Sequence, residues 1–119
     1  MISVTCITDF SIVKSFEVLG HSSGSEDDKI ICAAVSCLTR TAGEIITRLN
    51  GVVSEFCAPE PGSVVLLVHN YKECIQDKLS GITDFLLFGL IGIIRDYPGS
   101  IKLKINNKEW YDGSQKRWW

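Results

Sequence analysis

Residues 20–49 read GHSSGSEDDKIICAAVSCLTRTAGEIITRL, and the second half of this stretch decides the fold. Its apolar residues recur at alternating spacings of four and three, which predicts an amphipathic helix with a buried stripe. The stripe comprises Ile31, Val35, Leu38, Ala42, Ile45 and Leu49. A polar loop precedes this helix, and a histidine stands before the loop at the end of an expected strand. We therefore look for a functional site around the start of the helix.

Cys32 lies about a quarter-turn away from the apolar stripe, at roughly 100° per residue. The polar side that it occupies also carries Ser36, Thr39, Gly43 and Thr47. A cysteine that only fills a core would lie on the apolar stripe, since such cysteines are usually buried. The position of Cys32 therefore predicts a side chain that can be reached from outside.

Cys32 also lies near the expected N-terminus of the helix, where Asp27 and Asp28 are the predicted cap residues. Unpaired N–H groups and the positive end of the helix dipole favour a thiolate there, and the thiolate is the nucleophile. His21 stands across a loop long enough to bring its imidazole to the sulfur. This pattern indicates nucleophilic catalysis, although a cysteine at a helix start beside a histidine is more often structural.

The GH pair at residues 20–21 and the IICAAVS segment at residues 30–36 resemble the signature of the ribosomal-processing cysteine proteases, the Prp family. These small bacterial enzymes trim an N-terminal extension from a large-subunit ribosomal protein. The resemblance extends over residues 1–105 in length and element order, and its specific part is this one segment. It implies a cysteine endopeptidase of ribosome assembly whose partner is the N-terminal peptide of a ribosomal protein.

The resemblance also implies roles for individual residues. His21 would be the proton acceptor and Cys32 the nucleophile of a catalytic dyad. Ser36, one helical turn after the cysteine, and Asp28 would support them. Amide groups around residues 31–33 would then be the expected donors to the oxyanion.

The chain departs from the family pattern in the loop. Where the family usually has a Gly-x-Asp shortly before the cysteine, this chain has Lys29, with Asp28 one position earlier. Gly24 is the loop glycine, and the loop is one residue shorter than usual. The departure supports an alternative, a non-catalytic ribosome-associated binding module of the same fold. A third hypothesis is a thiol redox sensor.

The overall composition is that of one ordinary globular domain, with 119 residues and a net charge of −2. This charge gives no electrostatic reason to expect nucleic acid or an anionic membrane as a partner. The longest apolar run, residues 85–94, has about half the length that a membrane span needs. We therefore expect neither nucleic acid nor a membrane as a partner.

The five cysteines show no metal-type clustering, and no glycine-rich phosphate loop is present. We expect no metal and no cofactor. The cysteines are expected to be reduced, and no N-terminal charged-then-apolar signal is recognised, so we expect a cytoplasmic protein.

The remaining elements predict an α+β domain of order ββαβαβ, with two helices packed on a mixed four-stranded sheet. Strands are expected at residues 1–7, 12–19, 63–69 and 101–105. One helix is expected from the caps at Asp27 and Asp28 to Leu49, and a second from a cap at Ser80 to Tyr97. Residues 52–61 are an uncertain connector in which two prolines argue against a central strand. The domain would span residues 1–105, followed by an aromatic and basic tail at 106–119.

The second helix predicts a dimer. Its core stripe comprises Leu79, Ile82, Leu86, Leu90, Ile93 and Tyr97. Leu87, Phe88 and Ile91 are apolar on the other side, and a helix that is apolar all round is buried all round. In a domain this small, we expect the second apolar side to pack against a second subunit. The alternative is a helix buried on both sides within one chain.

Overall fold

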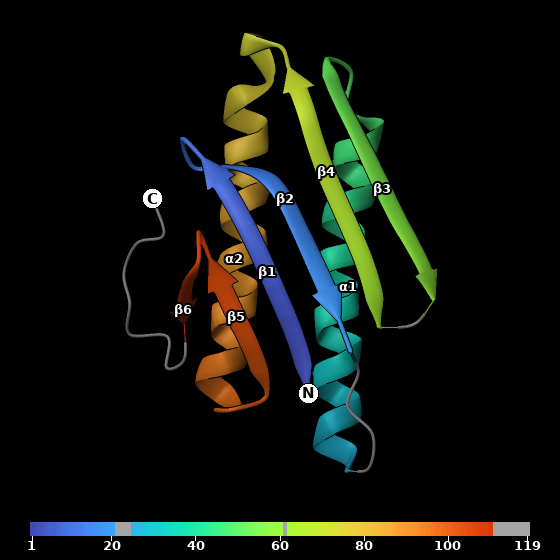
Figure 1. Cartoon of the computed structure of the whole chain (residues 1–119), viewed down its shortest axis with the longest axis vertical. Coiled ribbons are helices and arrows are strands. Elements are labelled where there is room, and N and C mark those ends of the chain that lie inside the picture. Colours follow the sequence, from blue (N-terminus) through green and yellow to red (C-terminus); the bar gives the residue numbers. More distant parts are fainter. Residues whose placement is uncertain (21–24, 61, 111–119) are drawn as a thin grey trace.

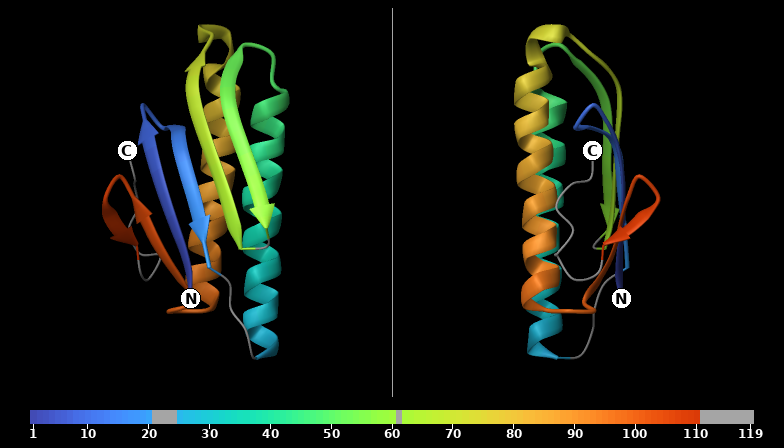
Figure 2. Two further views of the ribbon diagram at one scale, coloured as in Figure 1. Left: turned by 45° about the vertical axis from the view of Figure 1, so that its right-hand side comes forward. Right: turned by 90° about the vertical axis from the view of Figure 1, so that its left-hand side faces the viewer.

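The computed structural model describes residues 1–20, 25–60 and 62–110. Within these residues the protein is a two-layer α+β domain, with two helices on one face of a six-stranded mixed sheet (Figures 1 and 2). The strands are β1 (Ile2–Asp9), β2 (Ile12–Leu19), β3 (Val52–Glu60), β4 (Ser63–Tyr71), β5 (Ile101–Ile105) and β6 (Lys108–Trp110). The helices are α1 (Glu26–Arg48), the short 3-10 helix η1 (Glu73–Ile75) and α2 (Gln76–Asp96).

The sheet has the strand order β3-β4-β2-β1-β5-β6. β1 and β5 pair in parallel, and the other neighbours pair antiparallel. The α+β class, the mixed sheet and the two helices are confirmed, but the expected four strands are wrong, and so is the order ββαβαβ. The connector at residues 52–61 contributes β3, which pairs with β4 alone and so forms an edge of the sheet. Pro59 lies in the irregular stretch between Cys57 and Glu60, where the hydrogen bonds between β3 and β4 are already interrupted. The missing N–H of the proline therefore removes no regular strand hydrogen bond.

The other added strand lies beyond residue 105. Asn106 and Asn107 both have positive φ, which suits a two-residue hairpin turn that returns the chain as β6. Trp110 pairs with Leu103 and is 1% exposed, so this indole belongs to the core. The folded domain therefore continues past the expected boundary at residue 105 to residue 110. The remainder of the aromatic tail, residues 111–119, lies outside the described residues.

The face of α1 that packs on the sheet differs from the expected stripe. Thr39 and Gly43, predicted on the polar side, are buried, whereas Ile45 is 43% exposed. Thr39 can be buried because its hydroxyl donates to the Val35 carbonyl at 2.8 Å. Gly43 is buried because the Phe56 ring occupies the space that a side chain would need: a Cβ there would lie 2.2 Å from the ring.

The two helices run antiparallel beside one another (Figure 1). On α2, Leu87 and Ile91, which were expected to face away from the core, are buried within the same chain. Phe85 and Phe88 are the large apolar residues that remain outside, 74% and 56% exposed.

Candidate active site

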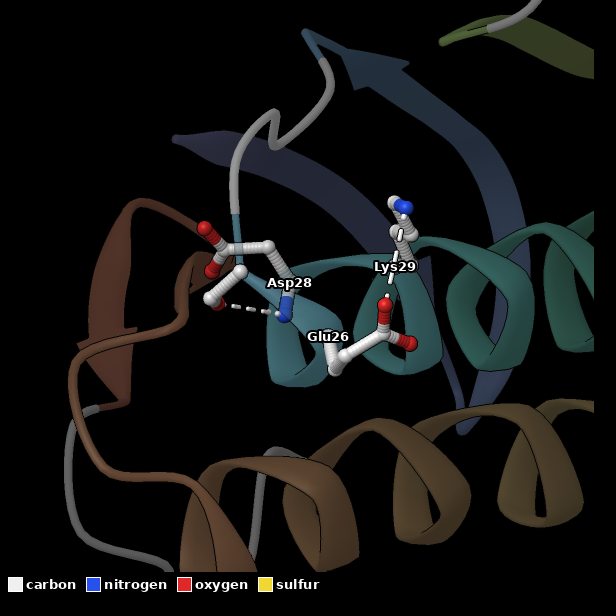
Figure 3. A network of polar contacts seen from close by, with 4 residues as sticks. Glu26, Asp28 and Lys29 are labelled. Atoms are coloured by element: carbon white, nitrogen blue, oxygen red, sulfur yellow. Dashed lines mark hydrogen bonds and ion pairs between the residues drawn. The ribbon is translucent and has the colours of Figure 1, made fainter.

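The N-terminus of α1 is organised by Ser25. This residue is the N-cap, and its hydroxyl accepts a hydrogen bond from the Asp28 N–H at 3.1 Å (Figure 3). The predicted caps, Asp27 and Asp28, lie instead in the first turn, where carboxylates stabilise the positive end of the helix. The helix therefore begins at Glu26, and Cys32 lies in its second turn rather than at its start.

This longer helix changes which amide groups are open. In an α-helix the first four N–H groups lack an intrahelical partner, and here, with Ser25 as the N-cap, they belong to residues 25–28. One of them is already engaged, since the Asp28 N–H bonds the Ser25 hydroxyl, and the Lys29 N–H makes the first bond of the helical ladder, to the Ser25 carbonyl. The amides of residues 31–33 lie in the regular helical ladder and are not available as oxyanion donors, contrary to the expectation from sequence.

Cys32 borders a cavity of about 270 Å³ between α1 and one end of the sheet. One wall is the face of α1 that carries Lys29, Cys32 and Ser36, at spacings of three and four residues. The described residues that line it are Ile2, Val18, Gly20, Lys29, Cys32, Val35, Ser36, Thr39, Gly62 and Val64. The beginnings of β1 and β4 and the end of β2 thus form the opposite wall. Cys32 is partly buried, so its sulfur is held on a largely apolar surface while remaining accessible.

Gly20 brings the chain out of β2 at the rim of this cavity. Its φ is +90°, and a Cβ there would lie 2.5 Å from the Met1 carbonyl oxygen. An L-residue with a side chain is therefore disfavoured for two reasons, the backbone conformation and the contact. The glycine of the GH pair fixes where the chain leaves the strand, directly before His21.

The predicted site residues have different placements. Cys32 and Ser36 lie together in the cavity wall. Asp28 lies in the first turn of α1 and is not part of the lining. His21 lies outside the described residues, as does the loop through Gly24. From the sequence, Lys29 was noted only as a departure from the family's loop pattern. Its spacing of three residues from Cys32 is the signal that could have predicted its place in the same cavity.

The five cysteines, all in the described part of the chain, form no disulfide bonds. Burial raises the pKa of the Cys6 thiol to about 12, which keeps that thiol protonated and unreactive at neutral pH. Cys37, Cys57 and Cys74 are exposed, and none of them borders the cavity of Cys32. No group of three His, Cys, Asp or Glu side chains in residues 1–20, 25–60 and 62–110 is placed to hold a metal ion.

A second hollow, the outer groove, lies between α1 and α2. It has a volume of about 630 Å³ and is lined by Cys37, Leu38, Thr41, Ala42, Ile45, Lys78, Gly81, Ile82 and Phe85. Judged by length and composition alone, α1 is apolar enough to cross a membrane, a property that core helices of soluble proteins share. About 33% of that segment is buried, and Ile45, one of its large apolar residues, is 43% exposed and lines the outer groove.

Comparison with known proteins identifies similar chains. The family model for the cysteine protease Prp matches residues 1–102. Among solved structures, SMU.848 from Streptococcus mutans is similar with a TM-score of 0.68 and 25% identity, over 88% of this chain and 96% of that one. No curated protein matches the sequence.

Two structures of the essential ribosomal processing protease Prp from S. aureus are also similar. One holds a substrate peptide (TM-score 0.70, 19% identity) and the other a covalently linked product peptide (TM-score 0.70, 20% identity). Both alignments cover 88% of this chain and 99% of the other chain.

Proposed function

The chain belongs to the Prp family of cysteine proteases, and from this membership we propose that it removes the N-terminal extension of a large-subunit ribosomal protein. The S. aureus relative is a ribosomal processing protease that has been seen with a substrate peptide and with a covalently linked product. The observation that carries the proposal for this chain is the placement of Cys32 on an accessible cavity at the end of β2.

In the proposed mechanism, the Cys32 sulfur attacks the carbonyl carbon of the scissile peptide bond and His21 accepts the thiol proton. Collapse of the tetrahedral intermediate breaks the C–N bond, and His21 gives its proton to the leaving amine. A thioester to Cys32 remains. Water then attacks this thioester, with its proton passing to His21, and the extension leaves with a new carboxyl terminus as the thiol re-forms.

Three features of the described residues support these roles. Gly20 directly follows β2 and lines the cavity that Cys32 borders, and His21 is the next residue in the sequence. Ser36 contributes a hydroxyl to the same wall as Cys32. The apolar side chains of the lining, those of Ile2, Val18, Val35 and Val64, exclude part of the water around the sulfur and so strengthen electrostatic interactions with the reacting atoms.

We further propose that the active form is a cytoplasmic homodimer in which a second copy covers the outer groove. Phe85, Phe88 and Ile45 are large apolar side chains exposed on the helix layer. Aromatic side chains at the centre of an apolar surface are typical anchors of subunit interfaces. The sheet covers the opposite side of both helices, so this outer side is the one available to a second subunit (Figure 2).

The test is cleavage of a synthetic peptide that spans the N-terminal extension encoded in the source organism's ribosomal protein. We expect wild-type protein to cut the peptide once. Mass spectrometry of the protein is expected to identify a thioester at Cys32 or, after treatment with an alkylating reagent, an alkyl group on the same sulfur. Cys32→Ala and His21→Ala are each expected to abolish turnover, whereas Ser36→Ala is expected to lower it. A ribosomal protein encoded without an extension, or cleavage that survives Cys32→Ala, would overturn the proposal.

A further inference from the structure

Lys29 places a positive charge at the cavity that contains the nucleophile. Among the described residues that line this cavity, it is the one with a charged side chain. Lys29 precedes Cys32 by three residues, so the two side chains share a face of α1, and Figure 3 shows the Lys29 side chain directed away from Asp28. A peptide bound in this cavity therefore lies against a residue that carries an ammonium group.

The ion pair that Lys29 makes is weak enough to be exchanged. Its ammonium lies 3.7 Å from a carboxylate oxygen of Glu26, and the two side chains are 68% and 87% exposed. Pairs of this kind are strongly screened by water and contribute little to stability. Lys29 is therefore able to leave Glu26 for a carboxylate presented at the cavity without loss of folding stability.

The rest of the cavity strengthens such an interaction. Ile2, Val18 and Val64 form an apolar wall opposite α1. A bound peptide fills this space and displaces water, which lowers the effective dielectric around the ammonium. A carboxylate next to Lys29 then gains more than it would on an open surface, whereas a second ammonium is repelled.

We propose that Lys29 is a specificity-determining residue that binds a carboxylate of the peptide at the Cys32 cavity. This inference rests on the proposed proteolysis and names the charge of the peptide that the site selects. The carboxylate comes either from an Asp or Glu side chain near the scissile bond or from the new C-terminus of the released extension. Both sources present the same group to the same ammonium, and the experiment separates them.

The first arm measures kcat/KM for peptides in which each residue within three positions of the scissile bond is replaced in turn by Glu, Gln or Lys. At one position wild-type protein is expected to prefer Glu over Gln by about fivefold, the factor typical of a partly exposed ion pair. Lys29→Gln removes this preference, and Lys29→Glu reverses it in favour of Lys. Lys102→Gln is the matched control, because Lys102 is exposed on β5 and borders neither this cavity nor the outer groove.

The second arm compares product peptides that end in a carboxylate or in a carboxamide, as inhibitors of wild-type protein and of Lys29→Gln. A preference for the acid that Lys29→Gln abolishes identifies the new C-terminus as the source. The same peptides are titrated onto Cys32→Ala by fluorescence anisotropy, so binding is read without turnover. If neither arm shows a charge preference that depends on Lys29 while wild-type protein still cleaves, the inference is overturned and the proteolytic function stands.

Discussion

Two hollows lie along α1, and each of them is bordered by one cysteine and one lysine. The cavity at the end of the sheet is bordered by Cys32 and Lys29, and the outer groove between the helices by Cys37 and Lys78. The two cysteines are five residues apart, which turns them about 140° from one another around the helix. The outer groove is also the larger, at about 630 Å³ against about 270 Å³.

Size and a nearby thiol therefore do not distinguish a catalytic site from an interface. The two hollows differ in what surrounds the sulfur. Cys32 shares its cavity with the end of β2 and with the hydroxyl of Ser36, whereas Cys37 shares the groove with Phe85 and other apolar side chains. The partly exposed thiol and the neighbouring serine of the smaller hollow suit the proposed acyl transfer, and the apolar side chains of the larger one suit the proposed subunit contact.

The strongest test of this difference is to remove each cysteine separately. Cys32→Ala is expected to lower kcat/KM for the extension peptide by about 10³-fold or more, since no other group replaces a covalent nucleophile. Cys37→Ala is expected to leave the peptide cleavage rate unchanged. Comparable losses in the two variants would mean that the comparison assigns the chemistry to the wrong hollow.

The sequence predicted α1 and a partly exposed thiol on it, because these signals are local, whereas the catalytic roles of Cys32 and His21 stay predictions. The four-and-three spacing identified α1, and the position of Cys32 off the apolar stripe indicated a reachable thiol. What it did not predict depends on contacts between distant segments. Thr39 and Gly43 are buried because a carbonyl and the Phe56 ring accommodate them, and neither partner is visible in the helical pattern.

The strand count was wrong for a similar reason. Prolines disfavour a central strand, but β3 is an edge strand that pairs with β4 alone. The residue pattern of a single strand does not indicate whether that strand lies at the edge or in the middle of a sheet. The cap of α1 was also misassigned, because Ser25, Asp27 and Asp28 are all good N-cap residues and the hydrogen bond to the Asp28 N–H selects Ser25.

A second test addresses the rim of the Cys32 cavity through two glycines with similar backbone conformation. Gly20 has φ +90° and a Cβ there would lie 2.5 Å from the Met1 oxygen, whereas Gly99 has φ +81° and no atom within 4 Å of the added Cβ. Gly99→Ala is expected to cost about 1 kcal/mol in the free energy of unfolding. Gly20→Ala is expected to cost about 2–4 kcal/mol, because the clash adds to the backbone strain.

Urea unfolding of the two alanine variants measures the difference between their free energies of unfolding. The rate of peptide cleavage by the folded fraction of each variant measures the effect on activity. Gly20→Ala is expected to be slower in cleavage even when fully folded, since the chain then leaves β2 along a changed path. Equal free energies of unfolding for the two variants would show that the contact with Met1 is readily relieved.

A third test addresses the outer groove. Phe85→Glu places a carboxylate in the centre of the proposed contact and is expected to raise the dimer dissociation constant by about tenfold to a hundredfold. Phe10→Glu is the matched control, because Phe10 is also strongly exposed but lies in the turn between β1 and β2. Sedimentation velocity across a dilution series measures both. A wild-type protein that is monomeric at every concentration would contradict the proposed interface.

The smallest expected effect is a difference between the rates at which individual thiols are alkylated at pH 8. This measurement reports on both hollows at once, because each of them contains one thiol. Cys6 is expected to stay unmodified in the native protein, because burial raises the pKa of its thiol to about 12. Cys57 is exposed on a strand remote from the groove and reports ordinary reactivity. If a second copy covers the outer groove, Cys37 reacts several-fold more slowly than Cys57 in concentrated protein and recovers on dilution. Phe85→Glu then removes this protection of Cys37 without changing the alkylation of Cys32, because the two thiols lie in separate hollows.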